Sequence, residues 1–186
     1  MKSKYNYINV VDVEATCFGG KPHPEKSEII EIGICCLDAK EMVPMKASNA
    51  SIFIKPEETE ISEYCTNLTH ITKDMIDTSG ISFREACSIL TEKYLSKNHV
   101  WASWGNYDRR IFMDNCKKKN IKYPFGVEHI NVKTLFALMH RIKPVGMEEA
   151  LKIIRIPLEG THHRGVDDAY NIAVILSSLL RENKVQ

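Results

Sequence analysis

The chain has 186 residues, of which 44% are apolar and 26% are charged. This length and composition predict one globular domain over residues 1–186 and exclude disordered, collagen-like and mucin-like chains. The 25 basic and 24 acidic residues leave a formal net charge of +1, so no overall positive field indicates a nucleic-acid partner. Any such partner must be held by local groups.

The sequence holds no run of about 18 apolar residues that would cross a membrane, and residues 1–5 lack the hydrophobic core of a secretory signal. We therefore expect no membrane partner and a cytoplasmic location. The six cysteines form no Cys-x-x-Cys pair, which favours buried free thiols over disulfides or a structural zinc site.

The first half of the chain predicts neighbouring antiparallel strands. Apolar, β-branched residues recur over 7–13, 29–37 and 50–54, and the links between these segments are too short for parallel crossovers. The polar segment 55–80 has no clear period. Because so long a loop is usually functional or locally structured, we expect it to face a substrate. Ser82 and Glu85 then predict a capping box that begins a helix.

The second half alternates strands and helices. The apolar spacing predicts strands over 99–104 and near 130, and helices over 108–119, from about 132, from about 146 and over 166–181. No repeat, low-complexity tract or linker divides the chain. Strands first, followed by alternating strands and helices, predict an α/β fold with a mixed sheet and helices packed on it.

Two acidic residues interrupt the first strand. Asp12 and Glu14 stand at i and i+2, so both carboxylates point to the same face of the strand. Two adjacent carboxylates repel unless a cation lies between them, which favours a hard divalent metal. The alternative interpretation is a strand end in solvent, where the acids have no special role.

Asp108 comes three and four residues before the apolar residues Ile111 and Phe112. Helical spacing therefore places it on the buried face, near the helix N-terminus, where the helix dipole favours a negative charge. The alternative is a simple capping residue.

The last predicted helix carries another inward acid. Asp168 lies four and seven residues before Ile172 and Ile175 of the apolar stripe, so it points to the core. Asp167 lies on a different face, which favours a helix cap or a partner that supports the site from behind. His162 and His163 occupy the preceding loop.

Together, three elements direct four carboxylates toward one end of the sheet. Buried charges of one sign would strongly destabilise a domain unless cations neutralise them. Oxygen ligands favour Mg²⁺ or Mn²⁺.

These residues resemble the motifs of the DEDDh (DnaQ-like) 3′-to-5′ exonucleases: a D-x-E strand, a helical Asp and a final H-x-x-x-x-D. The motifs are Asp12-Val13-Glu14-Ala15-Thr16, Asn106-Tyr107-Asp108 and His163 through Asp168. His162 and Asp167 share the last offset, but both the family's Asp-Asp-x-x-Asn-Ile run and the helical face select Asp168. The similarity continues through 28–33 and 65–72. These segments are similar to the branch that contains histone-mRNA 3′-end exonucleases and KapD-like proteins, and the resemblance covers roughly residues 6–180.

The resemblance implies an RNase H-like fold, with a five-stranded mixed sheet flanked by helices, as a single exonuclease domain. It implies a metal-dependent 3′-to-5′ exonuclease that acts on single-stranded nucleic acid, with RNA favoured over DNA, and releases nucleoside 5′-monophosphates. Two alternatives stay open. One is a DNA exonuclease for proofreading or repair, and the other is an inactive exonuclease fold that binds nucleic acid or protein.

The resemblance also implies residue roles. Asp12 would bridge two Mg²⁺ or Mn²⁺ ions, with Glu14 and Asp168 completing one site and Asp108 holding the second. His163 would be the general base, since imidazole titrates near neutral pH, whereas His162 is expected to be an ordinary loop residue. The implied substrate-binding residues are Ala15, Thr16, Leu68, His70 and Tyr107.

Two features qualify the match to the family. His70 stands where the family commonly has glycine, which leaves the shape of the substrate loop open. We also expect no hairpin-specific recognition, because no additional nucleic-acid-binding module precedes residue 6. The basic run over 117–119, with Lys122 after it, is expected to be a solvated helix end.

Overall fold

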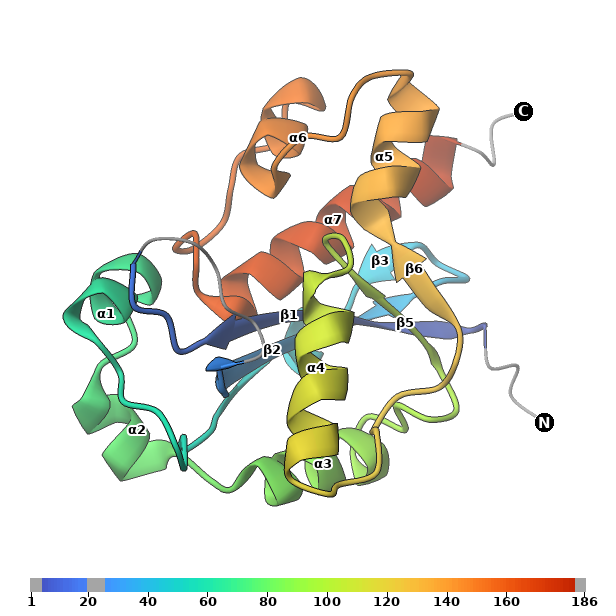
Figure 1. Ribbon diagram of the computed structural model, residues 1–186. Helices are drawn as coiled ribbons and strands as arrows, with labels where there is room; N and C mark the ends of the chain where they lie inside the picture. The colour runs from blue at the N-terminus through green and yellow to red at the C-terminus, as the bar shows by residue number, and fades with distance from the viewer. Residues whose placement is uncertain (1–4, 20–25, 183–186) are drawn as a thin grey trace.

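The strand that carries Asp12 and Glu14 lies at the centre of a mixed sheet in the computed structural model, which describes residues 5–19 and 26–182 (Figure 1). This strand, β1 (Tyr7–Ala15), pairs antiparallel with β2 (Ile29–Asp38) and parallel with β5 (Val100–Ser103). Three shorter strands complete the sheet. β6 (His129–Asn131) runs parallel to β5, while β3 (Val43–Pro44) and β4 (Ala50–Phe53) pair with β2.

The predicted α/β fold and its antiparallel beginning are confirmed. The six strands of the described ranges occupy five positions, because β3 and β4 pair with successive parts of the same edge of β2. The five-stranded expectation thus matches the five positions. The two-residue β3, too short to show a period, was not predicted.

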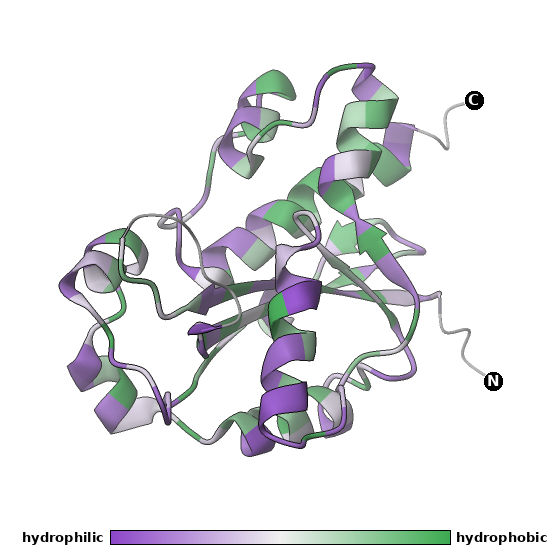
Figure 2. Ribbon diagram, in the orientation of Figure 1, coloured by the Kyte–Doolittle hydropathy of each residue, from purple (hydrophilic) through white to green (hydrophobic). Residues whose placement is uncertain are grey.

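Helices cover both faces of this sheet. One face carries α3 (Phe83–Glu92) and α4 (Tyr107–Lys118), and the other carries α5 (Val132–His140), α6 (Met147–Ile153) and α7 (Gly165–Glu182). In Figure 1, α4 lies in front of the sheet and α7 behind it. The visible side of α4, which faces away from the sheet, is largely hydrophilic in Figure 2.

The alternation of side chains along β1 decides which layer receives its acids. Val11 and Val13 pack in the core beneath α3 and α4, whereas Ile8 and Val10 pack in the core beneath α7. Because successive side chains of a strand point to opposite faces, the even-numbered Asp12 and Glu14 belong to the α7 side. On this face of β1, the two acids therefore follow Ile8 and Val10 at the C-terminal end of the strand.

The segment over 55–80 is more ordered than the sequence suggests. It contains two helices, α1 (Glu63–Thr69) and α2 (Lys73–Ser79), capped by the side chains of Ser62 and Thr72. The segment is thus locally structured, and the sequence pattern did not indicate its helices because seven residues are too few for an apolar stripe to repeat. The capping box of Ser82 and Glu85 at the start of α3 is confirmed.

The cysteines are free thiols, and the expected burial holds for four of the six. All six are free, and four of them, Cys35, Cys65, Cys87 and Cys116, are buried. Among the helices of the described residues, none combines the length and the apolar character needed to cross a membrane.

Two glycines bring the start of α7 directly onto the sheet. A Cβ atom at Gly33 of β2 would lie 1.8 Å from the carbonyl oxygen of Gly165. A Cβ at Gly165 would in turn lie 3.1 Å from the backbone oxygen of Asp12. Backbones approach this closely only where side chains are absent. The contact places Asp168, about one turn further along α7, over the end of β1.

Replacing Gly33 with Ala should therefore force α7 away from the sheet. We expect Gly33→Ala to lower the free energy of unfolding by about 3 kcal/mol, because the added methyl group meets backbone that cannot rotate aside. Urea denaturation measures this loss. Gly146→Ala is the control, since a Cβ there meets nothing within 4 Å, and it should cost less than about 1 kcal/mol. Equal stability of Gly33→Ala and the parent would contradict the close contact.

Candidate active site

Three of the predicted carboxylates meet at the end of β1. Oxygen atoms of Asp12, Glu14 and Asp168 all lie within 4.8 Å of one another. Asp12 and Glu14 come from the α7 side of β1, and Asp168 comes from the first turn of α7. A compact set of carboxylate oxygens suits a hard divalent cation. The described residues therefore fit a metal centre at this point.

The fourth carboxylate arrives from the opposite layer. β5 ends at Ser103, and the backbone N–H of Val13 in β1 donates to Asp108 Oδ1 at 3.1 Å. Asp108 is only 3% exposed, and its charge acts on the carboxyl group of Asp12. Beyond the end of β5, the Asp108 carboxylate thus accepts a β1 backbone N–H that no neighbouring strand pairs with. From α4, this carboxylate faces the same cluster.

Contacts far from the cluster fix α4 in place. The side chain of Asn115 accepts from the Ile29 N–H at 3.2 Å and donates to the Ser27 carbonyl at 3.1 Å. One turn later, the ammonium of Lys119 pairs with Glu28 at 2.8 Å. These bonds tie the C-terminal half of α4 to the beginning of β2, so the direction of α4 and the position of its first acid are set together.

Glu28 also organises the segment that leads to α1. Its carboxylate accepts the backbone N–H groups of Glu57, Glu58 and Thr59. Burial alone would raise the pKa of Glu28, but the Lys119 ammonium and these N–H groups lower it to about 2. Glu28 is therefore ionised at neutral pH and serves as a structural anchor.

The electrostatics of the cluster are dominated by burial and mutual repulsion. Burial raises the pKa of Asp12 well above its usual value, and the charges of Asp108, Glu14 and Asp168 add to this shift. Burial likewise raises the pKa of Glu14, and that of Asp108 to about 6. Such groups bind protons more tightly than exposed carboxyls do, and a bound cation would favour their ionised form. The cluster is thus built to exchange protons for metal.

Both histidines lie beside Asp168. The Nδ1 atom of His162 is 3.1 Å from Asp168 Oδ2, and the backbone N–H of His163 donates to the same oxygen at 2.9 Å. The two imidazoles stack with their centroids 4.0 Å apart. His162 was expected to be an ordinary loop residue, but its ring is bonded to an acid of the cluster. Adjacency in sequence did not indicate this contact.

The ring of His163 is suited to accept a proton. Burial lowers its pKa, the charge of His162 lowers it further, and the charge of Asp168 opposes both. A histidine whose pKa is lowered is neutral at physiological pH, with one ring nitrogen free to act as a base.

Hydrogen bonds shape the loop that presents these histidines. Asp167 accepts from the Thr161 N–H at 2.8 Å, and Asn171 bonds both backbone groups of Glu159. Asp167 is thus a loop-closing residue outside the cluster of metal-ligand candidates, as its helical face predicts. Asn171, one turn later, closes the base of the same loop.

The sequence analysis did not identify two residues of the site, Glu31 and Arg164. Glu31 in β2 is fully buried and accepts from the Gly165 N–H at 2.9 Å and from Ser51 Oγ at 2.6 Å. It also pairs with Arg164 at 3.3 Å, and the guanidinium partly offsets the raised pKa of Glu14. An acid inside an otherwise apolar strand was the available signal. Its partners Arg164 and Gly165 lie more than 130 positions away, so no local pattern indicated them.

The implied substrate residues surround the cluster from three elements. Leu68 and His70 lie at the end of α1, and His70 acts electrostatically on His163. His70 has φ 60° and ψ 14°, the left-handed backbone that favours glycine. The turn that the family builds with glycine is therefore kept, with some strain.

The other implied contacts differ in accessibility. Tyr107, at the start of α4, is 38% exposed, and burial of its hydroxyl beside Asp108 and Glu14 raises its pKa to about 12. Ala15 and Thr16 are buried. The Thr16 hydroxyl accepts from the Glu28 N–H at 2.9 Å, so this side chain supports the strand end from within. A direct substrate contact by Ala15 or Thr16 stays a prediction.

Comparison with known proteins agrees with this geometry. The family model described as Exonuclease (RNase_T) matches residues 10–176. The probable 3′-5′ exonuclease KapD of Bacillus subtilis is 27% identical over 183 residues, which cover 96% of this chain and 86% of KapD. ERI1 exoribonuclease 2 of Homo sapiens is 26% identical over 99% of this chain. The chain spans only 30% of the length of that relative.

Solved structures show the same architecture. The nuclease domain of 3′hExo, a DEDDh family member bound to rAMP, superposes with a TM-score of 0.86 at 26% identity. The match covers 98% of this chain and 95% of that domain. The expected membership of the DEDDh group and the RNase H-like fold are thereby confirmed.

The raised pKa values predict how stability depends on pH. A carboxyl with a higher pKa in the folded chain binds its proton more tightly there, so its contribution to stability falls as pH rises from about 4 through the folded pKa. Asp12→Asn removes one such group. We expect the metal-free variant to match the parent near pH 4 and to exceed it by about 1 to 3 kcal/mol at pH 7.5. Urea denaturation in a chelator measures the difference.

Adding MgCl₂ at pH 7.5 should stabilise the parent and leave Asp12→Asn nearly unchanged, since the cation replaces the protons only where the ligand set is complete. A metal-free Asp12→Asn protein that unfolds at a clearly lower urea concentration than the parent would show that the cluster is structural.

Proposed function

The chain belongs to the exonuclease family, and from this membership we propose that it hydrolyses the terminal phosphodiester bond at the 3′-OH end of single-stranded nucleic acid. We propose RNA as the favoured substrate over DNA and nucleoside 5′-monophosphates as the products. The observation that carries the proposal is the convergence of Asp12, Glu14 and Asp168 within 4.8 Å, with His163 bonded through its backbone to Asp168.

The relatives support the choice of RNA. Those named exoribonucleases, including 3′-5′ exoribonuclease 1 of Homo sapiens, align over nearly all of this chain. One similar structure is described as bound to rAMP, and another as recognising the 3′ end of a histone mRNA stem-loop. DNA is the alternative substrate. The rates of hydrolysis of single-stranded RNA and single-stranded DNA decide between the two.

Two Mg²⁺ ions, or Mn²⁺ in their place, are the proposed cofactors. Asp12 would contact both ions, Glu14 and Asp168 would complete one site, and Asp108 would serve the second. Bound cations of this kind neutralise the phosphate and the leaving oxygen during in-line displacement. The buried carboxylates supply the negative charge that holds such ions, and Arg164 limits the repulsion around Glu14.

His163 is the proposed general base. Its lowered pKa keeps the imidazole neutral, so the ring can take the proton of the attacking water. His162 bonds the carboxylate of Asp168 and stacks on His163, which makes it a positioning residue for both. Tyr107, exposed at the start of α4, is a proposed platform for the terminal base.

The set of residues also weighs against a role in binding alone. All four acids and His163 are in place, and the acids raise one another's pKa. A module that only binds nucleic acid would gain nothing from a repulsive acidic cluster, because phosphates are themselves anionic.

The proposed polarity predicts which oligonucleotides are degraded. A single-stranded RNA with a free 3′-OH should shorten from its 3′ end in the presence of Mg²⁺, and chelation should stop the reaction. An RNA that carries a 3′-phosphate should resist. Gel analysis of 5′-labelled RNA and DNA, with chromatography of the released nucleotides, measures polarity, preference and product. Rapid cleavage of a circular single strand would instead show an endonuclease.

The two histidines should differ in their effect on turnover. General-base catalysis typically contributes about 10²- to 10⁴-fold, so His163→Ala should lower kcat by that factor with metal binding nearly intact. His162→Ala should cost about tenfold or less, since it removes only the positioning contact with Asp168. At saturating Mg²⁺, the pH-rate profile of the parent should show an inflection on the acid side from protonation of His163, and this inflection should be absent in His163→Ala. If His162→Ala is the more damaging change, the assignment of the base is wrong.

A further inference from the structure

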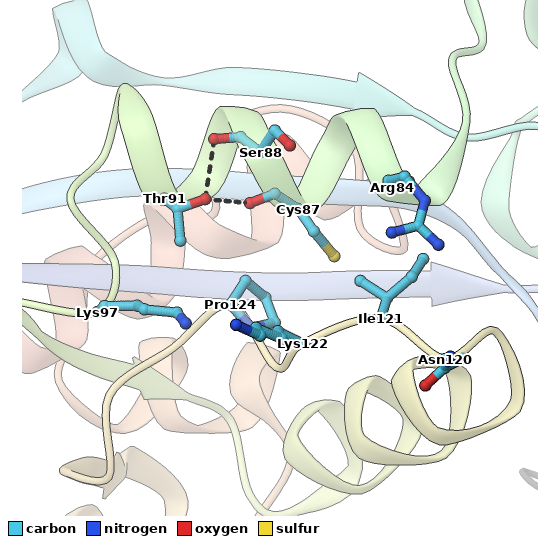
Figure 3. A pocket seen from close by; sticks show the side chains of 9 residues that line it. All are labelled: Arg84, Cys87, Ser88, Thr91, Lys97, Asn120, Ile121, Lys122 and Pro124. Carbon is cyan, nitrogen blue, oxygen red and sulfur yellow. Dashed lines mark hydrogen bonds between the residues drawn. The ribbon is translucent and has the colours of Figure 1, made fainter.

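A basic hollow lies between α3 and the segment that follows α4, away from the carboxylate cluster. It has a volume of about 590 Å³ and is lined by Arg84, Ser88, Lys97 and Lys122, among others. Figure 3 shows the ammonium groups of Lys97 and Lys122 and the guanidinium of Arg84 directed into the gap between these two segments. No carboxylate is among the described residues that line the hollow.

The cations of this hollow are not neutralised by acidic residues of the described ranges. Lys46, Lys73 and Lys152 each pair with a nearby acid. By contrast, Arg84, Lys97 and Lys122 form no ion pair within residues 5–19 and 26–182. Like charges that share a hollow repel one another, and a bound anion would relieve this repulsion. The positive charge of the hollow therefore suits an anionic ligand such as a backbone phosphate.

A second hollow adjoins the first and has a different character. It shares Ile121 with the basic hollow, has a volume of about 340 Å³ and is lined by Arg109, Met113, Tyr123 and Val127, among others. Met113 and Val127 are 52% and 86% exposed, so apolar groups are open to solvent here. An apolar and aromatic surface beside a basic one is the combination that binds the bases and phosphates of a single strand.

The helix α4 connects the candidate active site with both hollows, because its first turn carries Asp108 and its later residues and the segment after it line the hollows. Arg109 directly follows the cluster residue Asp108, whereas Ile121 and Lys122 lie beyond the C-terminal end of the helix. With 12 residues, α4 is about 18 Å long. At the roughly 3.4 Å rise of a stacked strand, about five nucleotides would span this length.

We propose that these hollows form a strand-binding track that holds the substrate upstream of its 3′ end, with backbone phosphates in the basic hollow and a base against the apolar one. The inference rests on the proposed function, which places the 3′ terminus at the carboxylate cluster. A dinucleotide is too short to occupy the cluster and the basic hollow together, whereas a 12-nucleotide strand reaches both.

The experiment compares two double variants that remove the same charge. Lys97→Ala/Lys122→Ala changes the basic hollow, and Lys117→Ala/Lys118→Ala removes two neighbouring lysines of α4 that line neither hollow. The kcat/KM of each variant is measured on a dinucleotide and on a 12-nucleotide RNA. We expect the first variant to lose roughly tenfold on the 12-mer, through KM, and to match the parent on the dinucleotide. The control should change both substrates less than about twofold.

Binding of a fluorescent 12-mer in a chelator gives a readout that does not need catalysis. For single strands, each phosphate contact contributes about 0.7 to the slope of log affinity against log salt concentration, so the first variant should lose about 1.4 from this slope. Equal losses by both double variants, or no loss by the first, would overturn the track. If the parent hydrolyses neither RNA, the proposed function fails, and the binding data still decide whether the track exists.

Discussion

The close contact between β2 and the start of α7 is the constraint on which the site depends. Gly33 and Gly165 leave room for two backbones to touch, and Glu31 accepts the Gly165 N–H at 2.9 Å in the same place. The first turn of α7 is thereby fixed against the sheet. Asp168 and the loop with both histidines are carried on that turn, so a shift of α7 by the width of one methyl group would separate them from Asp12.

The layer that contains α4 positions Asp108 through a series of contacts. Asp108 reaches the cluster because Asn115 and Lys119 hold the far half of α4 on β2. Glu28, the partner of Lys119, also gathers the backbone N–H groups of residues 57–59. One buried acid thus links α4 to the segment that leads into α1. Glu28 and the acids of the cluster all carry a carboxyl group, but their surroundings give them opposite roles.

The roles of Glu28 and Asp12 differ because their carboxylates have different neighbours. Glu28 receives N–H groups and an ammonium, which lower its pKa to about 2. Asp12 lies among other acids, so burial and repulsion raise its pKa. A carboxylate satisfied by the protein has no capacity left for a metal, whereas one that is repelled by its neighbours gains most from a cation. Asp12 is therefore left without such compensation, whereas Asp108 and Asp168 each accept a backbone N–H.

Much of the site follows from local patterns. The alternation along β1 pairs Asp12 with Glu14, and helical spacing turns Asp108 and Asp168 inward and Asp167 outward. These relations involve neighbours within about two turns or one strand, where backbone geometry alone decides the direction of a side chain. The same reasoning could not find the helices α1 and α2, because seven residues hold less than two full repeats of an apolar stripe.

Local patterns along the chain were enough to identify the ligand candidates, the order of the main elements and the faces that the acids occupy. Three contacts became visible only in the folded chain: Glu31 pairs with Arg164, His162 bonds Asp168, and basic side chains of α3 and of the segment after α4 line one hollow. Contacts of this kind depend on how complete elements pack, and Glu31 and Arg164 are 133 positions apart. Backbone periodicity carries no information over such separations, since the path of the chain between them is set by the packing of both layers on the sheet.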